Sequence, residues 1–165
     1  MARDKTYVCF DADTDIHLYR LMTAWHENER FDFNFENAHD INTLRKWSSE
    51  ETIKTKLRER LKNTKVLVVL IGENTKNLYK YVRWEIEYAI ENDIPIIAVN
   101  LNGARSRDSD LCPPLLKDEL AIHISYGPKI MHYALEHWPS SHESHKAKKE
   151  IAPYSYKSSV YENLK

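Results

Sequence analysis

The stretch that decides the fold is KVLVVLIGENTKNLYKYVRWEIEYAIEN, residues 65–92. Its first part, Val66 to Ile71, is an unbroken apolar run, which is typical of a strand covered on both faces in an α/β protein. After Gly72 the apolar residues recur with helical spacing and gather on one stripe when projected at about 100° per residue. They are Leu78, Val82, Ile86, Ala89 and Ile90. The stretch therefore predicts a buried strand followed by an amphipathic helix.

One acidic side chain does not fit the pattern of this helix. Glu85 falls on the flank of the apolar stripe, with Val82 and Ala89 on one side and the aromatic Tyr81 and Tyr88 on the other. The other charged residues of the helix project towards solvent: Lys80, Arg83, Glu87 and Glu91. A glutamate at the margin of a helix is more often solvated than catalytic, so position alone does not assign Glu85 a function.

Length and composition indicate one domain. A chain of 165 residues, 42% hydrophobic and 30% charged, is long enough for one well-buried core and short for two. We expect a single domain over residues 1–165, in which residues 140–165 form a C-terminal extension. Its tyrosines Tyr154, Tyr156 and Tyr161 are costly to leave in water, so we expect the extension to pack on the domain or on a second subunit.

Charge and residue usage exclude several classes of partner. A formal net charge of -1 gives no electrostatic reason to expect nucleic acid. No apolar run is long enough to span a bilayer and no signal peptide opens the chain, so we expect a cytoplasmic protein without a membrane partner. Cys9 and Cys112 are expected to be reduced thiols and not nucleophiles. The histidines between His132 and His145 match no familiar ligand spacing, so we predict no metal site.

The rest of the chain alternates strands and helices. Apolar and alternating patterns predict strands at residues 6–10, 31–35, 94–99 and 121–125, and helices at about 15–29 and 48–63. In the first helix Leu18, Leu21, Met22 and Trp25 should face inward, and Ser48 with Glu51 should form a capping box for the second. For residues 130–138 a helix and a hairpin are both compatible with the spacing. Residues 36–47 form a polar loop long enough to be functional.

This alternation of strands and helices predicts a mostly parallel sheet of five strands with helices on both faces. If the strand order is 2-1-3-4-5, ligands bind where the order reverses, between the carboxyl ends of the first and third strands. Residues 10–15, residues 72–79 and the start of the Glu85 helix converge there. With three glycines and neither a dinucleotide nor a P-loop signature, the usual phosphate-binding motifs are absent. Gly72 and Glu73 stand where a receiver domain needs its acceptor aspartate, which argues against that class.

The residues resemble a known family. The strand "T-x-V-x-V-V-L-I-G-x-x-T", the helix start Val82-Arg83-Trp84-Glu85-Ile86, the opening strand with Phe10, and "A-P-Y…S-S-V-Y" in residues 152–161 are similar to the TIR-like domain family of bacterial anti-phage defence, which includes Thoeris proteins. The resemblance covers most of the chain. It departs from the family at Tyr81, where tryptophan is usual, and at Cys9, where serine is common.

The resemblance implies a flavodoxin-like, three-layer TIR fold and an enzyme of the NAD+ glycohydrolase or ADP-ribosyl cyclase type. It implies cleavage of NAD+, as substrate and not as cofactor, to a cyclic or modified ADP-ribose that activates a separate effector protein, and we expect a homo-oligomer. The catalytic glutamate of the family maps onto Glu85. The expected substrate-binding residues, each of which could instead serve capping or packing, are Phe10, Asp11, Asp13, Glu73, Tyr81 and Trp84.

Two alternatives from the residues and the fold remain. A TIR-like module can act as a self-associating scaffold without turnover. A nucleoside 2-deoxyribosyltransferase-like enzyme also places a glutamate on a similar sheet, and would act on deoxynucleosides in place of NAD+.

Overall fold

The apolar run after Asn63 forms the central strand of the sheet. The computed structural model describes residues 5–27, 35–36, 49–77 and 81–164. Strand β3 spans Thr64–Ile71, and every side chain from Val66 to Ile71 is buried because helices cover both faces of the strand. The hydrophobic run, which no polar residue interrupts, is thus buried along its whole length.

The strands pair in the order β2-β1-β3-β4-β5-β6, and every neighbouring pair is parallel. The other strands are β1 (Lys5–Cys9), β2 (Phe35–Glu36), β4 (Ile96–Asn100), β5 (Ala121–Ser125) and β6 (Pro153–Ser155). The chain leaves β1 for β2 on one side and returns to β3 on the other. The strand order therefore reverses between β1 and β3, as the sequence predicted.

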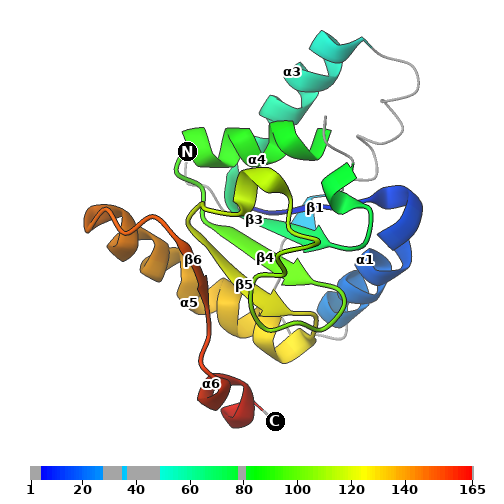
Figure 1. Cartoon of the computed structure of the whole chain (residues 1–165). Helices are drawn as coiled ribbons and strands as arrows, with labels where there is room; N and C mark the ends of the chain where they lie inside the picture. The colour runs from blue at the N-terminus through cyan, green and yellow to red at the C-terminus, as the bar shows by residue number, and fades with distance from the viewer. Residues whose placement is uncertain (1–4, 28–34, 37–48, 78–80, 165) are drawn as a thin grey trace.

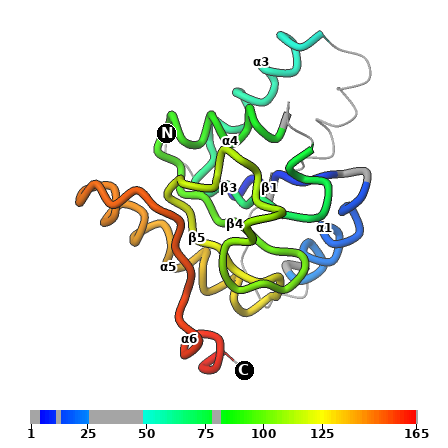
Figure 2. Tube along the Cα trace, viewed as in Figure 1, coloured from blue at the N-terminus to red at the C-terminus, as the bar shows by residue number. Residues whose placement is uncertain are grey.

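Helices form a layer on each face of the sheet, which gives the three-layer, flavodoxin-like α/β fold (Figure 1). The helices are α1 (Ala12–Glu27), α3 (Glu50–Leu61), α4 (Tyr81–Glu91), α5 (Pro128–Ala147) and α6 (Ser158–Asn163), with short 3₁₀ turns η1 (Thr75–Asn77) and η2 (Pro114–Leu116). Helices α3 and α4 cover one face, and α1 and α5 cover the other (Figures 1 and 2). This alternation follows from right-handed crossovers on both sides of the reversal.

The C-terminal quarter adds two features to the predicted topology. Residues 130–138 belong to the 20-residue helix α5, which starts with Pro128 in its first turn and continues to Ala147. The sheet has a sixth strand, β6, which extends the five expected strands by pairing with β5. The Tyr161 hydroxyl of α6 accepts a hydrogen bond from the Ser125 backbone N–H at 3.2 Å. Residues 153–161 thus pack on the domain, while contact with a second subunit stays a prediction.

Two local expectations were wrong. The N-cap of α3 is Ser49, whose hydroxyl accepts the Thr52 N–H at 3.3 Å, so the expected Ser48–Glu51 capping box does not start this helix. Leu21 is 49% exposed, although its spacing on α1 suggested burial. It points about 100° around the helix from the buried Met22, to the flank of the buried face. The expected strand at 31–35 is described only as β2, and the loop over 36–47 lies almost entirely outside the described residues.

The described residues contain neither a helix that could cross a membrane nor a metal site. No helix among them is both long and apolar enough to cross a membrane. Within the same residues, no three His, Cys, Asp or Glu side chains are grouped so that they could hold a metal ion. Cys9 and Cys112 are buried and form no disulfide, and burial raises the pKa of the Cys112 thiol to about 11. Cys112 is therefore a protonated, unreactive thiol at neutral pH.

Candidate active site

The first part of the site is built at the carboxyl ends of β1 and β3, where the strand order reverses. Phe10 directly follows β1, is buried, and stacks on Tyr19 of α1 with ring centroids 4.6 Å apart. The carbonyl of Asp11 accepts the Asp15 N–H at 2.8 Å, which closes the first turn of α1. Both carboxylates of this turn, Asp11 and Asp15, are buried. The turn after β1 therefore holds acidic groups below the protein surface.

Gly72 brings the end of β3 against Asp15. A Cβ atom added to Gly72 would lie 2.4 Å from Oδ2 of Asp15, closer than real Cβ contacts. Asp15 is 5% exposed, and its Oδ2 has no hydrogen-bond partner among the described residues. The lack of a side chain at position 72 is what allows the carboxyl group to approach the strand end.

The surroundings of Asp15 favour its protonated form. Burial raises the pKa of the Asp15 carboxyl above its ordinary value, and the nearby negative charges of Asp11 and then Glu73 raise it further, while His17 opposes them. Repulsion of this kind requires the three carboxyl groups to lie near one another. Acidic side chains from both the β1 and the β3 loops thus act on Asp15 at the reversal point.

The loop after β3 is fixed by its own hydrogen bonds. The buried Thr75 hydroxyl donates to the Leu70 carbonyl at 3.2 Å and accepts the Gly72 N–H at 2.8 Å. Lys76 Nζ donates to the Asp110 carbonyl at 2.6 Å, which ties this loop to the loop after β4. These bonds position Glu73 and the turn η1.

Glu85 is the buried carboxylate of α4. It is 3% exposed, whereas Glu87 reaches the surface and pairs with Arg83 at 2.7 Å. By helical position it lies between Val82, Ile86 and Ala89, which pack into the main core, and Trp84, which packs with α3. A carboxylate is costly to bury, so its inward position in an otherwise apolar stretch marks it as a candidate functional group.

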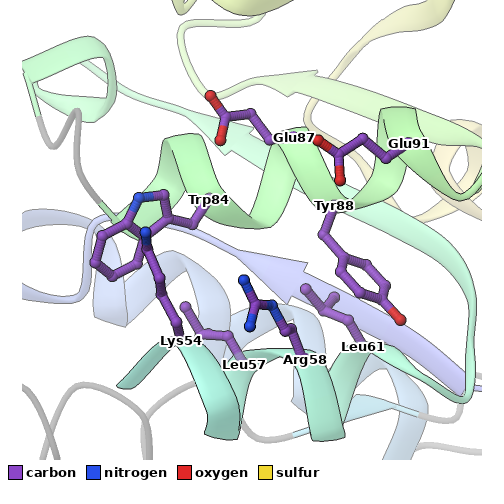
Figure 3. A pocket seen from close by; sticks show the side chains of 8 residues that line it. All are labelled: Lys54, Leu57, Arg58, Leu61, Trp84, Glu87, Tyr88 and Glu91. Carbon is purple, nitrogen blue, oxygen red and sulfur yellow. The ribbon is translucent and has the colours of Figure 1, made fainter. Parts of the chain in front are cut away.

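Trp84 lies on the side of α4 that faces α3. It packs against Ile53 and Leu57, and Lys54 Nζ lies 4.5 Å from the centre of its ring. Trp84 and Tyr88 line a cleft of about 120 Å³ between the two helices (Figure 3). Glu85 does not line this cleft. The cleft between α3 and α4 is therefore not the place where Glu85 would meet a substrate.

Four of the expected substrate-binding residues lie at two separate places in the structure. Phe10, Asp11 and Glu73 lie at the reversal point, and Trp84 lies between α3 and α4. Asp13 falls in α1 and Tyr81 in α4, but their side chains are outside the described part of the structure. Whether any of these residues binds substrate stays a prediction.

The part of the chain that forms this site matches a family of known proteins. The family described as Thoeris protein ThsB, TIR-like domain, matches residues 7–106. The chain belongs to this family. The match includes more than half of the 165 residues, from β1 to the loop after β4, and thus both Glu85 and the reversal point. Membership confirms the resemblance seen in the sequence and makes the chain a TIR-like protein of anti-phage defence.

Sequence reasoning missed the roles of Asp15 and Gly72 in this TIR-like domain. It placed them in two segments that converge, residues 10–15 and 72–79, but gave neither residue a role of its own. A usable signal was the glycine directly after a central strand, since such a position often permits close approach of another group. Its partner, however, is 57 residues away in the chain, and no local pattern links the two.

We expect Gly72→Ala to destabilise the domain by about 1–3 kcal/mol, because the new Cβ would overlap the Asp15 carboxyl group. Urea unfolding measures the change. In an Asp15→Ala background the same substitution should cost much less, since the overlapping group is gone. Gly127→Ala is the matched control, because its Cβ would meet only Ile130 Cγ2 at 3.7 Å. An equal cost of Gly72→Ala in both backgrounds would contradict the contact.

Proposed function

We propose that the chain cleaves NAD+ between nicotinamide and ribose and releases a cyclic or otherwise modified ADP-ribose. The observation that carries the proposal is the buried Glu85 carboxylate of α4 in a chain that belongs to the ThsB TIR-like family. Structurally, an inward carboxylate on the helix that follows the β3 loop suits a reaction at the sheet's reversal point.

The chemistry requires little more than one well-placed negative charge. When the bond between ribose C1′ and the nicotinamide nitrogen breaks, its electron pair goes to the nitrogen, so the cationic ring leaves as neutral nicotinamide. No strong general acid is needed for this step. Positive charge develops on the ribose, and the Glu85 carboxylate would oppose it, as carboxylates do in glycoside hydrolysis. An oxygen of water, or a nucleophile within the same molecule, then bonds to C1′ and gives the open or the cyclic product.

The acidic groups at the reversal point fit the substrate before cleavage. Asp11 and Glu73 lie close enough to Asp15 to raise its pKa. In the proposed complex they attract the positively charged nicotinamide ring, while Phe10 supports the same end of β1. We further propose that Asp13, Tyr81 and Trp84 contact the substrate, that the protein works in the cytoplasm as a homo-oligomer, and that the product signals to a separate effector.

The experiment incubates the purified full chain with NAD+, with and without lysate from phage-infected cells, and resolves nicotinamide and ADP-ribose products by mass. We expect nicotinamide release at least in the presence of infected lysate. Self-association with no release under either condition would favour a scaffold. Base exchange from deoxynucleosides, with NAD+ left intact, would favour a deoxyribosyltransferase.

A further inference from the structure

The cleft between α3 and α4 carries opposite charges on its two walls. Lys54 and Arg58 rise from α3 toward α4, whereas Glu87 and Glu91 belong to α4 (Figure 3). The cleft has a volume of about 120 Å³. The rest of its lining is apolar or aromatic: Leu57, Leu61, Trp84 and Tyr88. Neither Glu85 nor the carboxylates of the reversal point line this cleft, so its charges have no part in the proposed chemistry.

Helix α3 is supported from one side. Of its 12 residues only Ile53, Leu57 and Leu61 are buried. Ile53 and Leu57 form a small cluster with Trp84 of α4, which is separate from the main core. In Figure 1, α3 stands out from the body of the domain beyond α4. Among the described residues, α3 and α4 therefore present one continuous face on which the cleft lies.

Each wall of the cleft keeps one charge that the described part of the chain does not pair. Arg58 on α3 and Glu91 on α4 are both exposed. Neither side chain forms an ion pair or a hydrogen bond with another described residue, although both line the same cleft. Glu87, by contrast, pairs with Arg83 of its own helix at 2.7 Å. Arg58 and Glu91 are thus available to a partner molecule.

A second copy of the same chain matches this pattern of charge. Lys54 and Arg58 are four residues apart, as are Glu87 and Glu91, so each pair extends about 6 Å along its helix. The two helices run in the same direction along the cleft (Figure 3). A two-fold axis along the cleft would therefore place the basic pair of each copy over the acidic pair of the other. A partner of one charge sign would match only one wall.

We propose that the α3–α4 face, the surface formed by the residues that line this cleft, binds a second copy of the chain in a two-fold dimer. Each Arg58 pairs with Glu91 of the other copy, and Trp84 and Tyr88 are covered. The proposal deepens the homo-oligomer part of the proposed function and does not depend on NAD+ cleavage. Two helices give a face roughly 18 Å long and 20 Å wide. Because this is small for an interface, we expect a reversible dimer with a dissociation constant on the order of 100 µM.

The test follows the purified full chain by sedimentation equilibrium at concentrations up to about 1 mM. We expect a monomer–dimer equilibrium that weakens at high salt, because salt screens exposed ion pairs. A chain that stays monomeric at every concentration in low salt would overturn the proposal. Nicotinamide release is measured on the same samples. A dimer that releases no nicotinamide would support this face and count against NAD+ cleavage, so the two proposals can fail separately.

Charge reversal locates the contact. Arg58→Glu and Glu91→Arg should each weaken dimerisation at least about tenfold, because each replaces two attractions across the two-fold axis by two repulsions. Both positions are exposed, so the fold should be preserved, which circular dichroism checks. Lys56→Glu is the matched control, since Lys56 is exposed on the other side of α3 and the substitution changes the net charge equally. It should dimerise as the wild type does.

Mixing the two variants provides the decisive measurement. In an equimolar mixture of Arg58→Glu and Glu91→Arg, position 58 of each copy again faces an opposite charge at position 91 of the other. Dimerisation should therefore return to about the wild-type level, although neither variant dimerises well alone. Unchanged dimerisation of both single variants would place the contact elsewhere and overturn the proposal. A mixture that stays monomeric would overturn it as well.

Discussion

Glu85→Gln is expected to reduce NAD+ turnover at least about a hundredfold, the scale for losing one group that stabilises transition-state charge. The substitution keeps the size of the side chain and removes only its negative charge, so the oxocarbenium-like ribose loses its counter-charge. Because glutamine has the size of glutamate and fits the same buried position, the thermal unfolding temperature should change little. Nicotinamide release under conditions that activate the wild-type chain measures the effect.

Glu87→Gln provides the matched control on the same helix. Glu87 is two residues further along α4, reaches the surface and pairs there with Arg83. Its charge forms a surface ion pair that contributes about 0.5 kcal/mol or less to stability. Turnover and stability should therefore stay near the wild-type values. If Glu85→Gln consumed NAD+ at the wild-type rate, the catalytic assignment of Glu85 would be rejected even though the family membership stands.

Acid should destabilise the domain through His123. The free energy of unfolding should fall by about 3 kcal/mol between pH 6.5 and pH 4. His123 lies in β5, is 0% exposed, and neither ring nitrogen has a hydrogen-bond partner among the described residues. Burial is the main cause that lowers its pKa to about 4, and the positive charge of Arg107 is the second. Below pH 6.5 the unfolded chain binds a proton that the folded chain does not, so stability falls as the pH falls.

His123→Leu should flatten this dependence. Leucine has similar size and no nitrogen to protonate, so its unfolding free energy should match or exceed that of the wild type at pH 7 and exceed it clearly at pH 4.5. Urea unfolding at several pH values measures both. Burial also lowers the pKa of His142, so some acid sensitivity remains. His137→Leu, at an exposed position, serves as the control. A pH profile of His123→Leu parallel to that of the wild type would contradict the assignment.

The order of the elements and the fold class could be predicted because their signals are local. The apolar run of β3 and the 3.6-residue period of α4 each lie within one short window. The placement of Glu85 below the surface also followed from its angle on the helix, since the stripe beside it had to face the core. The bounds of β1, β3, β4 and β5 agreed within two residues, because these strands end where the apolar run ends.

The failures concern features that depend on what lies opposite a segment. Ile130 to Trp138 is compatible with two structures until the sheet provides a face for α5 to cover. Strand β6 is three residues long and has no apolar run of its own; its backbone pairs with β5 because the chain passes beside that open edge. Leu21 was expected to be buried because its spacing fits the apolar stripe, but the packing of α1 directs Tyr19 and Met22 inward and leaves Leu21 on the flank.

The sequence by itself determined the alternation of strands and helices of an α/β fold and the inward angle of Glu85, because both depend on periodicity along neighbouring residues. The place where the strand order reverses followed only under an assumed order of 2-1-3-4-5, and the pairing of distant strands decided it. Only the tertiary structure decided that Gly72 admits the Asp15 carboxyl, that the cleft between α3 and α4 has walls of opposite charge, and that Trp84 faces α3 and not the reversal point. These contacts join residues from distant parts of the chain, and their distances are set by how whole helices pack on the sheet.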